Sequence, residues 1–304
     1  MIHELEPTRF HVTLGSHEPV LRVASGDTIR TWTVDSGGSN ARGKQITDGG
    51  NPQTGPISVE GAEPGTTLAV RLDRIRPNRT RALTSPLIAA NVLDPGFSLG
   101  DAERDLDWWT LDLERSLARL DDPPAGLEGF ELPLDPMLGC FGVAPALGEA
   151  ISTATSAQHG GNMDYRGFRE GVTAYFPVFV EGALLHLGDG HAAQGDGEIV
   201  GTGIEVSMDV EVTVEVLGKQ SWWPRGEDDE FVFAVGNARP LDQAVQHATS
   251  ELVRWLRADY GLGYRAISAL LGQCIRYEVG NVYDPAYTMV AKVQKRLLPP
   301  RPRP

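Results

Sequence analysis

The stretch Met208-Asp-Val-Glu-Val-Thr-Val-Glu-Val216 decides the fold class of this chain. Its valines fall on one face of an extended backbone, and its polar residues (Asp209, Glu211, Thr213 and Glu215) fall on the other. This alternation has the period of a strand with one buried face. We therefore predict a half-buried antiparallel strand within residues 199–216.

Further strands are predicted on both sides of this stretch, wherever β-branched, aromatic or other apolar residues form short runs. These runs are His11 to Leu14, Val20 to Val23, Thr28 to Val34, Ile57 to Val59, Thr67 to Ile75, Val178 to Leu187 and Tyr287 to Val293. The 35 glycines and 21 prolines are spread along the chain, which indicates many turns between short strands.

Helical spacing appears only late in the chain. Apolar residues recur at intervals of three and four over residues 241–257, and a second short helix is predicted over Tyr264 to Leu271. Strands followed by helices favour a mainly β fold, α+β at the C-terminal end, over alternating βαβ units. We expect β-sandwich or barrel-like subdomains with the late helices packed on them.

The expected division is a β-rich core over residues 1–240, which includes the glycine-rich loops, and a C-terminal part over residues 241–304 packed on that core. Between the strands, the acidic segment 97–135 has no clean period and is predicted to be irregular, with a short helix near Leu113 to Leu120. The apolar, glycine-punctuated segment 136–150 is expected to form a buried loop or to line a cavity.

Charge and composition exclude several classes of function. The formal net charge of −14 over 304 residues would repel nucleic acid and anionic membranes. No apolar run of about 18 residues is present to span a membrane, and we expect no signal peptide, because no basic region followed by an apolar run opens the sequence. Two cysteines, Cys140 and Cys274, do not make a disulfide framework. We expect a cytoplasmic protein with reduced thiols.

The densest polar cluster is Gly188-Asp-Gly-His-Ala-Ala-Gln-Gly-Asp-Gly-Glu198, expected between two strands. Its small residues allow a tight backbone on which Asp189, His191, Gln194, Asp196 and Glu198 can converge. A carboxylate beside an imidazole can act as a general base or bind a divalent metal. The alternative is a glycine-rich hairpin whose aspartates bond to turn amides.

A second cluster, His159-Gly-Gly-Asn-Met-Asp164, again places imidazole, amide and carboxylate groups around glycines. Its alternative is a turn before a strand. Asp35, which ends a predicted strand, can point into a site or begin an Asx turn. Cys140 is either a nucleophile or, as is usual for a lone cysteine among apolar residues, a small buried hydrophobe. No G-x-S-x-G, H-E-x-x-H, P-loop or dinucleotide motif is present.

At these motifs the sequence resembles the acetamidase/formamidase family. The stretches that carry the resemblance are Asn51-Pro-Gln-Thr-Gly-Pro56, Val59-Glu-Gly-Ala-Glu-Pro-Gly65, Pro136-Met-Leu-Gly-Cys-Phe-Gly-Val-Ala-Pro145, Gly160-Gly-Asn-Met-Asp164, Val180-Glu-Gly-Ala183 and Gly188 to Glu198. The resemblance runs from about residue 10 to about residue 295. It implies a largely β fold, hydrolysis of short amides such as acetamide or formamide to a carboxylate and ammonia, and a divalent metal.

From the resemblance and the polar clusters we assign provisional roles. The expected metal is zinc, and it would be held by some of Asp35, His159, Asp164 and His191. Glu198 is the expected general base and acid, Asp196 is a further catalytic residue, and Asn162 is a donor to the oxyanion. The expected partner is a small amide, with no nucleic acid and no membrane, and a homo-oligomer, taken as a dimer, is expected.

Two alternatives stay open at the level of sequence. One is a non-catalytic β-sandwich protein that binds a metal or a small polar ligand with the same loops. The other is a metal-free amidase in which Cys140 is the nucleophile.

Overall fold

The alternating stretch forms β18 (Met208–Leu217) in a computed structural model that describes residues 1–99 and 105–301. The strand pairs antiparallel with β5 (Thr28–Trp32) on one side and with β7 (Thr67–Pro77) on the other. Val210, Val212 and Val214 are buried, as predicted. One face of the strand therefore belongs to the core, and its other face carries charge.

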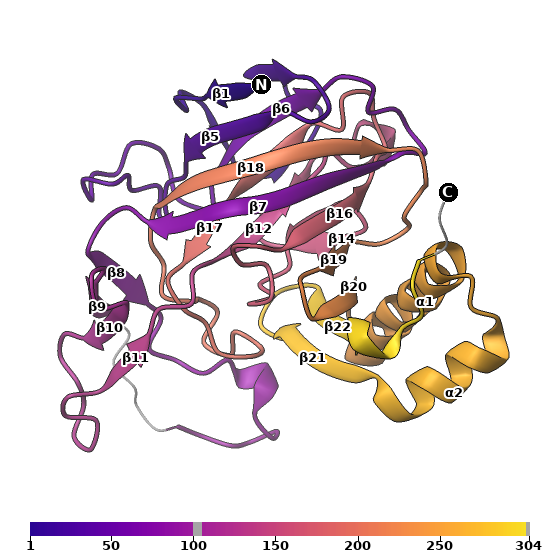
Figure 1. Cartoon of the computed structure of the whole chain (residues 1–304). Coiled ribbons are helices and arrows are strands. Elements are labelled where there is room, and N and C mark those ends of the chain that lie inside the picture. The colour runs from indigo at the N-terminus through magenta and orange to yellow at the C-terminus, as the bar shows by residue number, and fades with distance from the viewer. Residues whose placement is uncertain (100–104, 302–304) are drawn as a thin grey trace.

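Two large sheets form most of the molecule (Figure 1). The nine-stranded sheet has the order β1 (Ile2–Glu4), β5, β18, β7, β16 (Thr173–Pro177), β19 (Arg225–Glu227), β20 (Phe231–Ala238), β22 (Tyr287–Gln294) and β21 (Arg276–Asn281). The seven-stranded sheet has the order β14 (Ser156–Ala157), β15 (Gly160–Asn162), β12 (Met137–Gly142), β17 (Leu185–His191), β6 (Gln53–Val59) and β2 (Phe10–His11), with β4 (Leu21–Val23) also pairing with β6.

The two large sheets share one hydrophobic core. Figure 1 shows β7 and β18 crossing in front of β12 and β17. Val70 and Val212 from the first sheet belong to the same buried cluster as Phe141 and Leu187 from the second. The expected mainly β, sandwich-like architecture is thus confirmed, and three strands of the seven-stranded sheet, β6, β12 and β17, are buried along their whole length.

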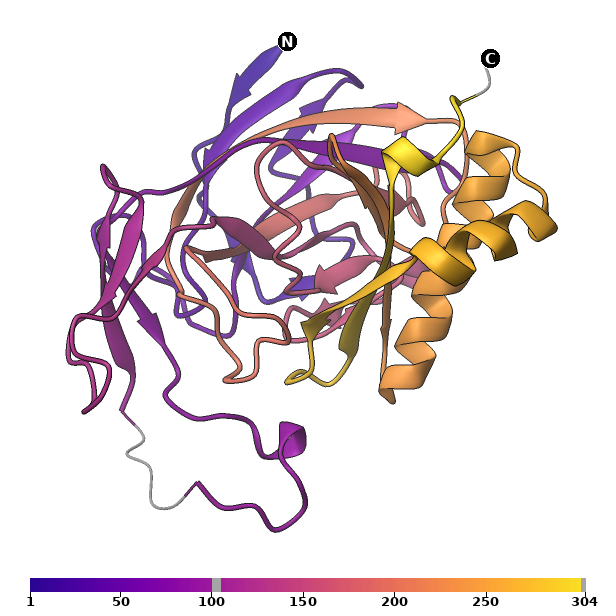
Figure 2. The ribbon, with the colours of Figure 1, turned by 60° about the horizontal axis from the view of Figure 1, so that its bottom comes forward.

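Two smaller sheets complete the β structure of the described residues. One consists of β8 (Arg81–Thr84), β9 (Asp107–Asp112), β10 (Leu117–Leu120) and β11 (Glu131–Pro133) and projects from the side of the molecule, at the left of Figure 2. The other pairs β3 (Thr13–Leu14) with β13 (Ile151–Ser152). Short 3₁₀ turns lie at Ala90–Val92, Ala146–Gly148 and Lys295–Leu297.

Three predictions between the strands were wrong. The helix expected near Leu113 to Leu120 is the hairpin of β9 and β10, where Trp109 and Leu111 alternate with exposed residues. The segment 136–150, expected as a buried loop or a cavity lining, contains β12, which is buried on both faces and so lacks the alternation that marks a strand. The expected strand 178–187 is interrupted, because Ala183 and Leu184 have positive φ, and β17 begins only at Leu185.

The late helices pack on the end of the nine-stranded sheet, as predicted. Helix α1 (Leu241–Tyr260) ends at Gly261, whose left-handed conformation is typical of a helix C-terminus, and α2 (Tyr264–Cys274) follows. Leu252 and Trp255 of α1 are buried against Val232 of β20 and Val293 of β22. Because β20 pairs with β22, the nine-stranded sheet contains residues from both sides of position 240. The division of the chain into a core over residues 1–240 and a C-terminal part over residues 241–304 stays a prediction.

No helix among the described residues is long and apolar enough to cross a membrane.

Candidate active site

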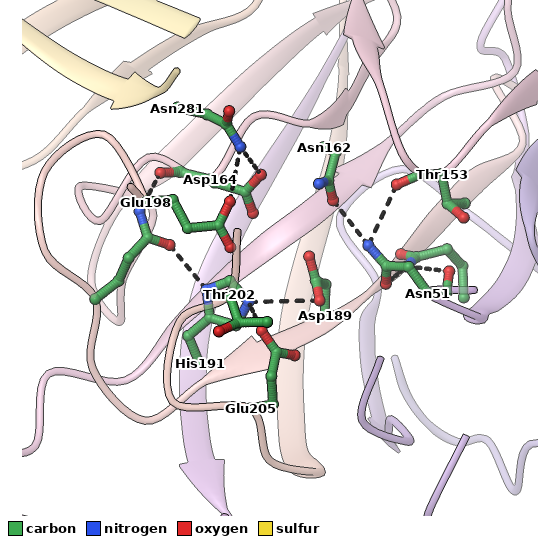
Figure 3. A network of polar contacts seen from close by, with 12 residues as sticks. Asn51, Thr153, Asn162, Asp164, Asp189, His191, Glu198, Thr202, Glu205 and Asn281 are labelled. Carbon is green, nitrogen blue, oxygen red and sulfur yellow. Dashed lines mark hydrogen bonds and ion pairs between the residues drawn. The ribbon is translucent and has the colours of Figure 1, made fainter. Parts of the chain in front are cut away.

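The site lies on the seven-stranded sheet, where β12 and β17 are neighbours (Figure 3). Asp189 and His191 are two residues apart on β17, so their side chains leave the same face of the sheet. Gly139 of β12 lies beneath them: a Cβ atom there would be 2.7 Å from Asp189 Oδ2, 2.9 Å from His191 Cε1 and closer still to Asp164 Oδ1. The absence of a side chain at position 139 therefore makes room for these three groups.

His191 lies at the centre of the site with no exposed surface. Its Nε2 lies 2.9 Å from Glu205 Oε1 and 3.4 Å from Asp189 Oδ1, and its Nδ1 lies 2.8 Å from Gln194 Oε1. Burial lowers the pKa of His191, but the carboxylates of Glu205 and Asp189 outweigh it, and the pKa is raised well above its ordinary value.

A second pair of carboxylates, Asp164 and Glu198, faces His191 from the other side. Asn281 Nδ2, at the end of β21, lies 2.7 Å from Asp164 Oδ2, 2.7 Å from Glu198 Oε2 and 3.1 Å from Asp284 Oδ2. Burial, and then the neighbouring carboxylates, raise the pKa of Asp164 and of Glu198 well above the ordinary range. Both carboxyl groups thus hold a proton more tightly than they would in water.

A row of amides extends the network away from His191. Asn162 donates from Nδ2 to Asp284 Oδ2 at 2.6 Å and accepts from Asn51 Nδ2 at 2.8 Å. Gln53 Nε2 in turn donates to Asn51 Oδ1 at 2.8 Å. Burial raises the pKa of Asp284 to about 6. Both ends of the Asn162 amide are therefore engaged within the protein.

The charge of the site is strongly unbalanced. Five buried carboxylates (Asp164, Asp189, Glu198, Glu205 and Asp284) surround one imidazole. In the described part of the chain, no Lys or Arg forms an ion pair with any of the five. Isolated buried carboxylates are strongly unfavourable, so the cluster requires protons or a cation.

The backbone of the site is also unusual. Asn51, Asp164, Asp189 and Glu198 have φ values of 63°, 43°, 58° and 47°, in the left-handed region. The described chain has eight non-glycine residues with positive φ, and these four belong to the polar network. Such conformations cost on the order of 1–3 kcal/mol each and cluster at functional sites, where the surrounding structure enforces them.

The whole arrangement of sheets and loops is similar to that of a solved acetamidase. The acetamidase from Yersinia enterocolitica is 31% identical, with a TM-score of 0.86, and the match covers 99% of this chain and 94% of that one. The chain belongs to the acetamidase/formamidase family. The resemblance that the sequence motifs suggested is thereby confirmed, and the family assignment supports the prediction of an amidohydrolase.

Three further comparisons agree. A predicted acetamidase/formamidase from Thermoanaerobacter tengcongensis is 30% identical, with a TM-score of 0.81 over 98% of this chain and 97% of that one. The model of the acetamidase/formamidase family matches residues 146–245. The acetamidase of Mycolicibacterium smegmatis is 38% identical over 94 residues, which are 31% of this chain and 23% of that protein. The aligned part thus spans about a quarter of this curated relative.

Four of the seven residues given a provisional catalytic or metal-binding role meet in one network: Asn162, Asp164, His191 and Glu198. Three do not join it. Asp35 is buried but paired with Arg79, and it accepts a hydrogen bond from the Ser39 amide at 2.8 Å. His159 is buried outside both groups of possible ligands, and burial lowers its pKa to about 4. Asp196 is exposed and lies 3.5 Å from Arg166.

Sequence reasoning missed three acidic or amide residues of the site and left Asp189 without a role. Glu205 is the lone acid in the apolar run Gly203-Ile-Glu-Val206, and Asn281 and Asp284 lie in the turn Gly280-Asn-Val-Tyr-Asp-Pro285. An acidic residue within an apolar run can indicate a site, because an acidic side chain is almost never fully buried unless it is paired with another group. The turn carries no comparable signal, since Asn and Asp are ordinary turn residues.

Proposed function

We propose that this chain hydrolyses a small aliphatic amide, such as acetamide or formamide, to a carboxylate and ammonia with the help of a divalent cation, for which zinc is our choice. The observation that carries the proposal is the excess of buried carboxylates around His191 in a chain of the acetamidase/formamidase family. A cation at this point would balance the charge that the protein leaves uncompensated.

The residues present fit such a cation. Asp164 Oδ1 and Glu205 Oε2 are buried without a hydrogen-bond partner in the described chain, and His191 Nε2 faces the carboxylates of Glu205 and Asp189. Carboxylate oxygen and imidazole nitrogen are ligands that zinc accepts. His191, Asp189 and Glu205 would hold the ion, and Asp164 would add a further oxygen. When bound, the ion would polarise the amide carbonyl and make water a usable nucleophile near neutral pH.

Glu198 would move the proton. Because its pKa is raised, the Glu198 carboxylate can take a proton from the attacking water and then donate it to the nitrogen that leaves as ammonia. Asn281 holds the Glu198 carboxylate in place through its Nδ2. Asn162 could act as a donor to the oxyanion if substrate replaced Asp284 as the partner of its Nδ2. The catalytic role assigned to Asp196 stays a prediction.

A metal-free route through Cys140 has less support. Cys140 is fully buried on β12, and burial together with Asp189 and Asp164 raises the pKa of its thiol well above the ordinary value. The thiolate is the reactive form, so this environment opposes it. A non-catalytic binding protein would be consistent with the same cluster of carboxylates. Measured turnover of an amide would distinguish the enzyme from such a binding protein.

The test is ammonia release from formamide, acetamide, propionamide and urea, before and after chelation. We expect release that is lost on chelation and restored by one added metal. Glu198→Gln should lower kcat by about 10²–10⁴-fold. Asp196→Asn, at an exposed position on the same loop, tests the catalytic role predicted for Asp196, and an unchanged kcat would remove that role. Ammonia release that resists chelators but is blocked by a thiol reagent would indicate that Cys140 is the nucleophile. No release from any amide would favour the binding protein.

We further propose a cytoplasmic location, supported by two free cysteines, Cys140 and Cys274. A homodimer remains our expectation for the assembly, and sedimentation velocity would test it.

A further inference from the structure

The amide of Gln194 has only one orientation that satisfies its surroundings. Its Nε2 lies 2.5 Å from the carbonyl oxygen of Asp164 and 3.4 Å from that of Gly280. Carbonyl oxygens only accept hydrogen bonds, so the NH₂ end of the amide must face them. The oxygen end must then face His191 Nδ1, at 2.8 Å.

This orientation fixes the proton on the His191 ring. Gln194 Oε1 is an acceptor, and a hydrogen bond to it requires a proton on Nδ1. Nε2 is then the ring nitrogen left to bind a cation, and it is the nitrogen that lies near Glu205 Oε1 and Asp189 Oδ1. A ring turned by 180°, or protonated on Nε2 alone, would lose the Gln194 bond.

We propose that Gln194 is the positioning residue that holds His191 with its proton on Nδ1 and its Nε2 aimed between Asp189 and Glu205. The ring is thereby prepared to bind a cation before one arrives. The positioning role of Gln194 is not part of the proposed function. It rests on that function only in taking the bound ion to be zinc. Partners that orient a ligating histidine in this way typically contribute 10–100-fold to metal affinity.

The neighbourhood of Gln194 makes a clean substitution available. Gln194 also lines a cavity of about 500 Å³ whose other walls include Trp109, Leu120 and Ile204. Methionine has the length of glutamine and no hydrogen-bonding amide, and an apolar wall accommodates it. Gln194→Met should therefore fold, while removing both the acceptor for Nδ1 and the anchor to Asp164 and Gly280. Gln194→Glu keeps an acceptor oxygen for Nδ1.

The experiment uses two readouts on the whole chain. In the metal-free protein labelled with ¹⁵N-histidine, NMR would detect the Nδ1–H proton of His191, identified by its absence in His191→Gln. Competition with a zinc chelator would give the zinc affinity. Gln243→Met is the matched control, since Gln243 is exposed on α1 and far along the chain from the site.

We expect a slowly exchanging Nδ1–H signal in the unaltered chain, in Gln194→Glu and in Gln243→Met, and its loss in Gln194→Met. Zinc affinity should fall by about 10–100-fold in Gln194→Met and be unchanged in Gln243→Met. A signal that persists in Gln194→Met would overturn the proposal. A chain that binds no zinc would refute the proposed metal, and the Nδ1–H signal would still decide the role of Gln194.

Discussion

Replacing Gly139 by alanine places one methyl group at the point where the site converges. The new Cβ would lie 2.7 Å from Asp189 Oδ2 and 2.9 Å from His191 Cε1, whereas ordinary van der Waals contact begins at 3.4 Å. Each group must therefore move by half an ångström or more, and Asp164 must move further. Because β12 is paired on both sides, with β15 and β17, its backbone cannot retreat easily.

We expect two separate consequences of Gly139→Ala. Overpacking a buried position costs about 1–3 kcal/mol of stability, which urea unfolding would measure. Misplacement of reacting groups by about 1 Å can cost on the order of 10²-fold in rate, so kcat/KM for ammonia release should fall by about that factor. Zinc affinity, measured by chelator competition, should fall as well, because Asp164, Asp189 and His191 must separate.

The control for Gly139→Ala is Gly195→Ala, on the loop that leads to Glu198. A Cβ at Gly195 would meet nothing within 4 Å, so we expect little change in stability, zinc affinity or turnover. If Gly139→Ala keeps the turnover and zinc affinity of the unaltered chain, then the groups above β12 are not the reacting ones, and the site assigned here is wrong.

Two further predictions concern buried ionisable side chains outside the polar network of the site. His186 is fully buried, and burial lowers its pKa from 6.5 to about 3; the unfolded chain then binds a proton below pH 6.5 that the native chain does not, so stability should fall by about 2–3 kcal/mol between pH 6.5 and pH 4.5. Urea unfolding at both pH values should show a smaller loss for His186→Phe, and an equal loss would contradict the assignment. Arg79→Met leaves the Asp35 carboxylate buried without its cation, which should cost about 3–5 kcal/mol. Adding Asp35→Asn should recover part of that loss in urea unfolding, and no recovery would mean that the ion pair is not the cause.

The mainly β fold could be predicted because its central strands have one buried and one exposed face. In β18 the buried valines alternate with charged residues, and the amphipathic pattern of α1 is equally clear. The prediction failed where that contrast disappears. Every residue of β12 is buried, so the strand has no polar face to mark its period. The β9–β10 hairpin has acidic residues at the ends of β9 (Asp107 and Asp112) and in its turn (Glu114), and these make its sequence resemble an irregular acidic segment.

The site could be predicted only as far as its residues are close in sequence. Asp189, His191 and Glu198 lie within ten positions, and composition alone singled them out. Glu205, Asn281 and Asp284 join them through sheet pairing and through the return of the chain after β21, which a single sequence does not encode locally. His159 was expected beside His191 because it shares a glycine-rich segment with Asp164. In the structure, however, the ring of His159 is buried outside the groups of possible ligands.

The glycines that drew attention to these segments support the site in two different ways. Gly139 and Gly203 are needed for space: a Cβ at Gly203 would lie 2.5 Å from Cγ and Nδ1 of His191. The chain does not use glycine at Asp164, Asp189 and Glu198, although all three have positive φ, and each of these positions carries a carboxylate of the buried cluster. The strain at these three positions and the close approach at Gly139 and Gly203 thus have one cause, the crowding of carboxylates around a single imidazole. A cation bound there would stabilise the crowded arrangement, and we expect the metal-free chain to be the less stable form.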